Sequence, residues 1–97
     1  MSNGTTYRLG FREEAKKEWD RLTPAVREQF KKKLLERCDN PRPPAAKLNG
    51  AKDRYKIKLA SAGYRLVYEV RDAELLILVI AIGRRDKSAV YRTAERR

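Results

Sequence analysis

RYKIKLASAGYRLVYEV, residues 54–70, decides the fold, because apolar and polar side chains alternate along both of its halves. Such alternation over short runs is typical of a β-strand with one buried face, so this stretch is predicted to be a β-hairpin. An even-membered loop around Ser61 and Ala62 brings the large apolar side chains to one face. The register that follows pairs Leu59 with Tyr64, Ile57 with Leu66 and Tyr55 with Tyr68.

The other face of the predicted hairpin carries positive charge. Lys56 and Lys58 lie on one strand and Arg65 on the other, and the predicted register places Lys58 directly opposite Arg65. We expect no acidic side chain on this face within the hairpin. Like charges that face each other across a strand pair are destabilising. Two interpretations remain open: the long basic side chains spread into water, or the face binds an anion.

The segments around the hairpin predict an α+β domain. Residues 6–11 alternate like a strand, and residues 11–22 and 23–38 carry apolar side chains at helical spacing, with Thr23 as a candidate N-cap. Almost nothing separates these two segments, which favours an antiparallel helix hairpin. Residues 74–83 form a continuous apolar run, typical of a strand buried on both faces. This order predicts a mostly antiparallel sheet with the helix pair packed on one face.

The charge of the chain is strongly positive and unevenly distributed. The 97 residues are expected to form one domain, with residues 1–5 flexible and residues 84–97 a basic segment that includes a short helix. The formal net charge is +11. Residues 42–71 carry eight basic and two acidic side chains, and residues 84–97 carry six and two. A localised positive surface attracts polyanions, and nucleic acid is the first candidate.

The composition also disfavours several classes of protein. Cys38 is the only cysteine, so no disulfide forms within the chain, and a reducing cytoplasm is the expected compartment. The start of the chain lacks a signal-peptide pattern, and the longest apolar run, residues 75–82, is too short to span a bilayer. Histidine is absent, which removes the commonest general acid–base group and the commonest zinc ligand. We therefore expect no membrane association, no metal and no cofactor.

Four motifs resemble those of the RelE toxins of bacterial and archaeal toxin–antitoxin systems. They are EW-x-x-L at 18–22, VREQFKKKL at 26–34, YKIKL-x-S-x-GYRLVY at 55–68 and I-x-IGRRDKS-x-VY at 80–91. The resemblance covers roughly residues 7–94. It implies the fold of the RelE/ParE superfamily. It also implies a ribosome-dependent endoribonuclease that cuts mRNA codons in the A site of the 70S ribosome and halts translation.

The same resemblance implies a catalytic set and partners. Arg84 stands where the family often has a lysine. The family implies a RelB-like antitoxin, which wraps the toxin, blocks its entry into the ribosome and joins it in a complex that represses operator DNA. The residues that match the family's two lysines, two arginines and tyrosine are Lys56, Lys58, Arg65, Arg85 and Tyr91.

Metal-free RNA cleavage uses the neighbouring 2′-hydroxyl as nucleophile and needs a base, an acid and charge stabilisation at the phosphorane. Without histidine, Lys58 is the expected base, because neighbouring cations favour the neutral form of a lysine. Lys56 and Arg65 are expected to stabilise the phosphorane. Arg85 is expected to add positive charge near the phosphorane. That Arg85 also acts as the general acid, which protonates the leaving 5′-oxygen, remains an open alternative. Tyr91 is expected to stack on a splayed mRNA base, with plain packing as the alternative.

Further basic residues are expected to contact the substrate or ribosomal RNA. Arg84 and Arg85, which follow the buried strand, are expected to converge on the face that carries Lys58. The lysine run at 31–33 is either a solvated helix face or an RNA contact. The candidate contacts are Lys31, Lys32, Lys33, Lys47, Lys52, Arg54, Arg84 and Lys87.

Two alternatives to a nuclease remain. A ParE-like inhibitor of DNA gyrase would share the fold without the basic catalytic set. A plain basic nucleic-acid-binding module would need a positive surface, but not Lys58, Arg85 and Tyr91 in particular. Cys38 is expected to be a small buried hydrophobe rather than a nucleophile, because the chain has no histidine to activate its thiol.

Overall fold

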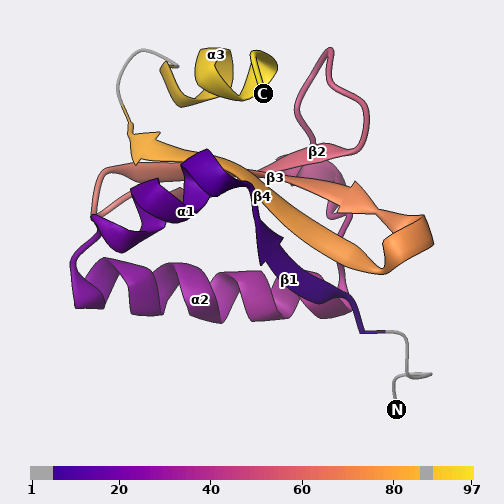
Figure 1. Cartoon of the computed structure of the whole chain (residues 1–97), viewed down its shortest axis with the longest axis horizontal. Helices are drawn as coiled ribbons and strands as arrows, with labels where there is room; N and C mark the ends of the chain where they lie inside the picture. Colours follow the sequence, from indigo (N-terminus) through magenta and orange to yellow (C-terminus); the bar gives the residue numbers. More distant parts are fainter. Residues whose placement is uncertain (1–5, 86–88) are drawn as a thin grey trace.

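The computed structural model describes residues 6–85 and 89–97, and a four-stranded mixed sheet lies at its centre (Figure 1). The order across the sheet is β1-β4-β3-β2, with β1 parallel to β4 and the other neighbours antiparallel. The predicted mostly antiparallel sheet is therefore confirmed. The strands are β1 Arg8–Phe11, β2 Arg54–Leu59, β3 Tyr64–Arg71 and β4 Leu76–Arg84.

Helices cover both faces of this sheet (Figure 1). The helices α1, Glu13–Asp20, and α2, Pro24–Asp39, lie on one face, and α3, Ala89–Glu95, lies on the other. Single 3₁₀ turns, Pro44–Ala46 and Asp72–Glu74, precede β2 and β4. The predicted helix pair on one face and the short C-terminal helix are confirmed. Within the described ranges, no helix is long and apolar enough to cross a bilayer.

The local sequence explains where α2 begins and which side it buries. The Thr23 hydroxyl caps the helix by accepting a hydrogen bond of 3.3 Å from the Val26 N–H. Pro24 occupies the first turn, where a backbone N–H has no partner within the helix, so the lack of this group in proline costs no hydrogen bond. The predicted span of this helix is confirmed to within one residue. The apolar row that α2 buries against the sheet consists of Val26, Phe30, Leu34 and Cys38.

Helix α1 is shorter than the sequence pattern indicates. The pattern predicts a helix over 11–22, whereas α1 begins at Glu13 and ends at Asp20. Phe11 instead ends β1, where it pairs with Val79 of β4. Because pairing with β4 satisfies the backbone there, the chain stays extended to this point and turns into the helix two residues later.

The β2–β3 hairpin has the predicted register. The glycine at the end of its turn, Gly63, has a φ of +73°, in the left-handed region that favours glycine. Its N–H donates to the Leu59 carbonyl at 2.8 Å, and its carbonyl accepts from the Arg85 N–H at 2.8 Å. The turn therefore also anchors the end of β4. The confirmed pairs are Tyr55 with Tyr68, Ile57 with Leu66 and Leu59 with Tyr64.

Strand β4 is buried on both faces, as its continuous apolar run predicts. Ile77, Val79 and Ile82 belong to the larger hydrophobic cluster, which lies beneath α1 and α2. Ile80 and Ala81 belong to a smaller cluster beneath α3. An apolar run buried on both faces needs a second element to shield it from water, and α3 does so on this face.

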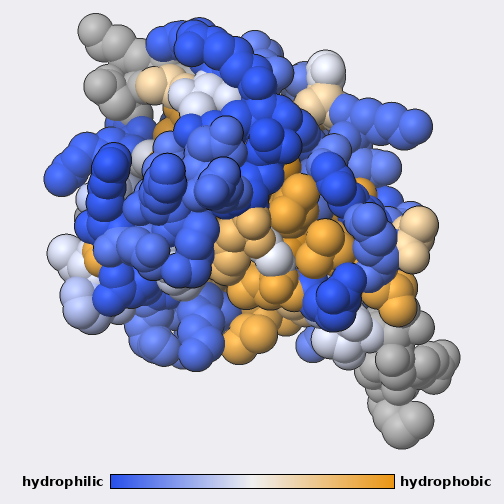
Figure 2. Space-filling view, viewed as in Figure 1, coloured by the Kyte–Doolittle hydropathy of each residue, from blue (hydrophilic) through white to orange (hydrophobic). Residues whose placement is uncertain are grey.

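The outer surface is mostly hydrophilic (Figure 2). In this view, apolar atoms gather in one band over β1 and the adjoining part of β4, and hydrophilic side chains cover most of the rest. Leu35 and Leu75 are the large apolar side chains that stay exposed in the described part of the chain. The surface thus agrees with a charge-rich composition.

Side chains from α1 and from residue 97 cover the edge of β4 beyond β1. Because β1 ends opposite Val79, no strand among residues 6–85 and 89–97 lies beside the following residues on that edge. The Glu18 carboxylate accepts a 3.0 Å hydrogen bond from the Ile82 N–H, and Arg97 donates to the Ile80 carbonyl at 2.9 Å. Glu18 and Arg97 also pair with each other, at 2.9 and 3.0 Å. This edge clasp, Glu18 with Arg97, ties α1 and the end of the α3 segment to β4.

Replacing Glu18 with alanine should lower the free energy of unfolding by about 2 kcal/mol, because the Ile82 N–H loses its acceptor and the Arg97 guanidinium loses its carboxylate partner. Urea unfolding followed by circular dichroism measures this change. Glu28→Ala, at an exposed position of α2, is the control and should stay within about 0.5 kcal/mol of wild type. A loss for Glu18→Ala no larger than that of the control would contradict the clasp.

Candidate active site

Three cations lie on the sheet face that α3 partly covers. Lys56 and Lys58 extend from β2 and Arg65 from β3, and Lys58 pairs directly with Arg65, as predicted. Lys58 is exposed, whereas Lys56 and Arg65 are half-buried. Among the described residues, no carboxylate forms an ion pair with any of the three. Their positive charge is therefore free to act on an anionic ligand.

The expectation that this face of the hairpin lacks an acidic side chain is wrong. Glu69 of β3 lies on it, because side chains alternate along the strand, and it pairs across the hairpin with Arg54. Its carboxylate lies 3.8 Å from Nε of Arg54 and 3.1 Å from Nε of Arg71. Two arginines thus neutralise Glu69 at one end of the face. The uncompensated charge lies at the other end, around Lys58 and Arg65.

Helix α3 places Tyr91 against Arg65. The guanidinium carbon of Arg65 lies 5.0 Å from the centroid of the Tyr91 ring, which is a cation–π contact. Gly83 of β4 makes this approach possible, since a Cβ at that position would lie only 2.9 Å from Cγ2 of Val90 in α3. The fold therefore brings Tyr91 and the hairpin cations together, as the resemblance implies.

Two buried polar atoms of this pair have no hydrogen-bond partner within the described residues. They are Nε of Arg65 and the hydroxyl of Tyr91. A buried polar group without a partner costs about 1–3 kcal/mol, and such groups are few in native proteins. Arg65 and Tyr91 therefore keep a hydrogen-bonding capacity that the folded chain does not satisfy.

Arg84, at the end of β4, does not lie on the face that carries Lys58. Arg84 pairs with Tyr64 in the sheet, and its guanidinium carbon lies 5.3 Å from the Tyr64 ring centroid, on the side of the sheet that α1 and α2 cover. The prediction that Arg84 joins Arg85 on the Lys58 face is therefore wrong, since neighbouring strand residues point to opposite faces. Arg85 follows the strand, is exposed, and bonds through its N–H to the hairpin turn.

The remaining predicted RNA contacts are scattered over the molecule. The lysines at 31–33 are exposed on α2, on the opposite side of the sheet from α3 (Figure 1). Lys52 is exposed in the loop before β2. Lys47 is exposed too, and its Nζ donates to the Ala51 carbonyl at 3.2 Å. Lys87 lies outside the described residues.

Two arginines are engaged in holding β2 in place. Arg54, a predicted RNA contact, donates from Nη1 to the Ala94 carbonyl in α3 at 2.6 Å, and its side chain is only 16% exposed. Arg37 of α2 donates from Nη1 to the Lys56 carbonyl at 3.1 Å and to the Tyr68 hydroxyl at 2.9 Å. These contacts join β2 to a helix on each face of the sheet. They fix the backbone that carries Lys56.

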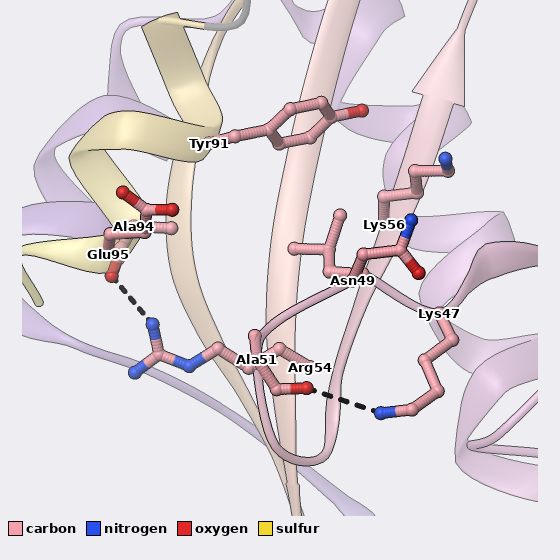
Figure 3. A pocket seen from close by; sticks show the side chains of 9 residues that line it. Lys47, Asn49, Ala51, Arg54, Lys56, Tyr91, Ala94 and Glu95 are labelled. Carbon is pink, nitrogen blue, oxygen red and sulfur yellow. Dashed lines mark hydrogen bonds between the residues drawn. The ribbon is translucent and has the colours of Figure 1, made fainter.

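A hollow of about 270 Å³ lies beside Lys56 and Tyr91, between the loop before β2 and the end of α3 (Figure 3). Tyr91 extends from α3 toward Lys56, and the Asn49 amide lies between Lys47 and Lys56 (Figure 3). The sequence pattern does not point to Asn49 as a lining residue, because the bridge of Lys47 to Tyr55 that brings this loop back to β2 is a contact that no local pattern reveals. The lining residues are Lys47, Leu48, Asn49, Ala51, Arg54, Lys56, Tyr91, Ala94 and Glu95.

Cys38 is buried near the end of α2, as predicted. Burial raises the pKa of its thiol, and the neighbouring Asp39 carboxylate raises that pKa further. A raised pKa leaves less of the reactive thiolate at neutral pH. Cys38 is therefore a packing residue of the core.

The sequence is similar to characterised toxins over most of its length. A family model described as the ParE toxin of the type II toxin-antitoxin system, parDE, matches residues 9–89. A curated relative from Escherichia coli, mRNA interferase toxin RelE, is 53% identical over 91 residues, which make up 94% of this chain and 96% of the relative. Both matches span well over half of the chain.

Two solved structures of the Escherichia coli toxin RelE have the same fold. A double mutant in the free state gives a TM-score of 0.87 at 50% identity, covering 94% of this chain and 96% of that one. The same mutant in complex with a peptide of the antitoxin RelBc gives 0.81 at 52% identity, covering 92% of this chain and 94% of that one. Sequence and fold agree, and this chain belongs to the RelE family of type II toxin–antitoxin toxins.

Proposed function

We propose that this chain is a type II toxin that acts as an mRNA interferase, an endoribonuclease that cuts mRNA codons in the A site of the ribosome. One observation carries the proposal: Lys58 opposes Arg65 beside Tyr91, and no described carboxylate pairs with these cations. Opposed cations destabilise a hairpin but suit a bound phosphate. The 53% identity to a relative named mRNA interferase toxin RelE supports the same function.

The proposed reaction is attack of the substrate's own 2′-hydroxyl on the neighbouring phosphate. It leaves a 2′,3′-cyclic phosphate on one product and a 5′-hydroxyl on the other. Lys58 takes the proton from the 2′-hydroxyl, and the leaving 5′-oxygen takes a proton from solvent water, with Arg85 as the alternative acid. The exposure of Lys58 and its lack of an ion pair among the described residues support its role, because the amine is free to reach the RNA.

Positive charge around the phosphate stabilises the phosphorane. Lys56 and Arg65 supply it from the two strands, and the partnerless Nε of Arg65 supports this role, because a guanidinium binds phosphate oxygens through several N–H groups. Arg85, exposed beside the hairpin turn, adds charge from the end of β4. Preorganised charge of this kind is often the largest single contribution to catalysis.

Tyr91 orients the substrate by stacking on a base splayed out of the mRNA. Its contact with Arg65 supports this role, since one residue then places the base while its neighbour holds the phosphate. The ribosome positions the codon, because so small a site makes few contacts and should bind free RNA weakly.

The proposed protein partner is a RelB-like antitoxin, and the solved complex of Escherichia coli RelE with an antitoxin RelBc peptide supports it. The other proposed partners are polyanions, which the net charge of +11 favours. They are mRNA and ribosomal RNA in the A site of the 70S ribosome, and operator DNA through the toxin–antitoxin complex. The proposed compartment is the cytoplasm.

Primer extension on mRNA bound to purified ribosomes tests the proposal. We expect cuts within the A-site codon, and far fewer on the same mRNA without ribosomes. A parallel supercoiling assay with DNA gyrase addresses the ParE-like alternative. Inhibition of supercoiling without any mRNA cut would contradict the nuclease and favour a gyrase inhibitor. RNA binding with neither effect would favour a plain nucleic-acid-binding module.

A further inference from the structure

The hollow in Figure 3 is continuous with the candidate active site, because Lys56 and Tyr91 belong to both. A ligand group in the hollow would therefore be adjacent to a phosphate held by the hairpin cations. The volume, about 270 Å³, falls just below the range of roughly 300–1,000 Å³ typical of pockets for drug-sized ligands. This size suits one flat ring system rather than two stacked ones.

Apart from Lys56, which belongs to the cationic set of the candidate active site, the charged groups in the wall of the hollow are poorly placed for a second phosphate. The Nζ of Lys47 donates to the Ala51 carbonyl at 3.2 Å, and Nη1 of Arg54 donates to the Ala94 carbonyl at 2.6 Å (Figure 3). Both cations are therefore engaged in hydrogen bonds to the backbone of residues that line the hollow. The carboxylate of Glu95 adds a negative charge to its lining. A neutral group fits this wall better than an anion.

Asn49 is the side-chain amide in the wall, and like the Tyr91 hydroxyl it has no hydrogen-bond partner among the described residues. Its side-chain amide makes no hydrogen bond with another described residue, and it lies between Lys47 and Lys56 (Figure 3). An amide offers both donors and an acceptor. This combination matches adenine, which presents an acceptor at N7 beside a donor at N6. Guanine presents two acceptors on the same edge, so its O6 would face the amide oxygen.

We propose that this hollow binds one mRNA base next to the scissile phosphate and that Asn49 selects adenine there. The inference rests on the proposed function and adds base specificity to it. Leu48 and the Tyr91 ring provide the apolar wall against which a splayed base packs. Because Lys56 lines the hollow and Lys58 follows it two positions along the same strand, a base held by Asn49 brings its own phosphate to the cations.

The test is a cleavage profile over mRNAs that present every codon in the ribosomal A site, read by sequencing the cut ends. We expect wild type to favour adenine at one position of the codon. Asn49→Ala should lower the ratio of adenine to guanine cleavage at that position about ten-fold, the discrimination typical of one two-bond amide contact. Asn49→Asp, whose carboxylate only accepts, should shift the preference toward cytosine, whose amino group donates.

Asn40→Ala is the matched control, because Asn40 is an exposed asparagine after α2 and does not line the hollow. Absence of cleavage by wild type would contradict the proposed function itself. Cleavage by wild type with one profile shared by all four proteins would overturn the base site alone. An equal loss at every codon in Asn49→Ala, with unchanged thermal unfolding, would also overturn it, since Asn49 would then serve cleavage in general.

Discussion

Lys58→Ala, with Lys56 left in place, is expected to lower the rate of mRNA cleavage on the ribosome by about 10²–10⁴-fold, the usual contribution of a positioned general base. Single-turnover cleavage with excess toxin measures this rate without a contribution from product release. Lys58 is exposed, so its loss should leave the unfolding transition close to that of wild type. A variant that cuts A-site mRNA at the wild-type rate would show that another group takes the proton.

Two companion variants separate the role of Lys58 as a base from its role as a charge. Lys58→Arg keeps the positive charge but holds its proton tightly, so it should stay nearly as inactive as Lys58→Ala. Recovery of most of the activity in Lys58→Arg would mean that charge alone matters at this position. Lys17→Ala removes an exposed lysine of α1, away from the hairpin, and should cleave like wild type.

Arg65→Ala should lower the cleavage rate by about 10²–10³-fold, because it removes preorganised charge where the phosphorane forms. The substitution also leaves the Tyr91 ring without the guanidinium that lies over it. Arg65→Lys keeps the charge and loses the planar group, so it should restore only part of the rate. Arg21→Ala, an exposed arginine that follows α1, is the control for the loss of one positive charge.

A double-mutant cycle tests whether Arg65 and Tyr91 act as a unit. If they do, Arg65→Ala and Tyr91→Ala together should slow cleavage by less than the product of their separate effects. Effects that multiply would contradict a joint role and leave the 5.0 Å contact as packing. Urea unfolding of each variant keeps losses of stability apart from losses of catalysis.

The hairpin is the element whose sequence was most informative. Alternation and an even-membered loop predict its register, and the pairing of Lys58 with Arg65 follows from that register without further information. The same alternation places Glu69 on the cationic face and Arg84 on the opposite face, with Tyr64, and both consequences were missed. Consistent use of the strand period would have found them from the sequence.

Other differences could not be found in this way. The first helix loses its predicted start because Phe11 pairs with Val79, and the sequence does not show which strand will lie beside which. Arg54 carries the same charge as any candidate RNA contact, yet its guanidinium is used to hold α3. The charge of a side chain does not show whether that side chain already bonds to another group of the folded protein.

The sequence by itself determined the hairpin, the buried strand after it, the helix pair and the cations that oppose each other, because these depend on periodicity and turn chemistry within short segments. Only the tertiary structure decided that Tyr91 lies over Arg65, that Glu18 and Arg97 close the edge of β4, and that Asn49 lies beside Lys56. Such contacts join distant parts of the chain, 79 positions apart for Glu18 and Arg97. They form only when α3 and the loop before β2 pack on the finished sheet, so no local pattern encodes them.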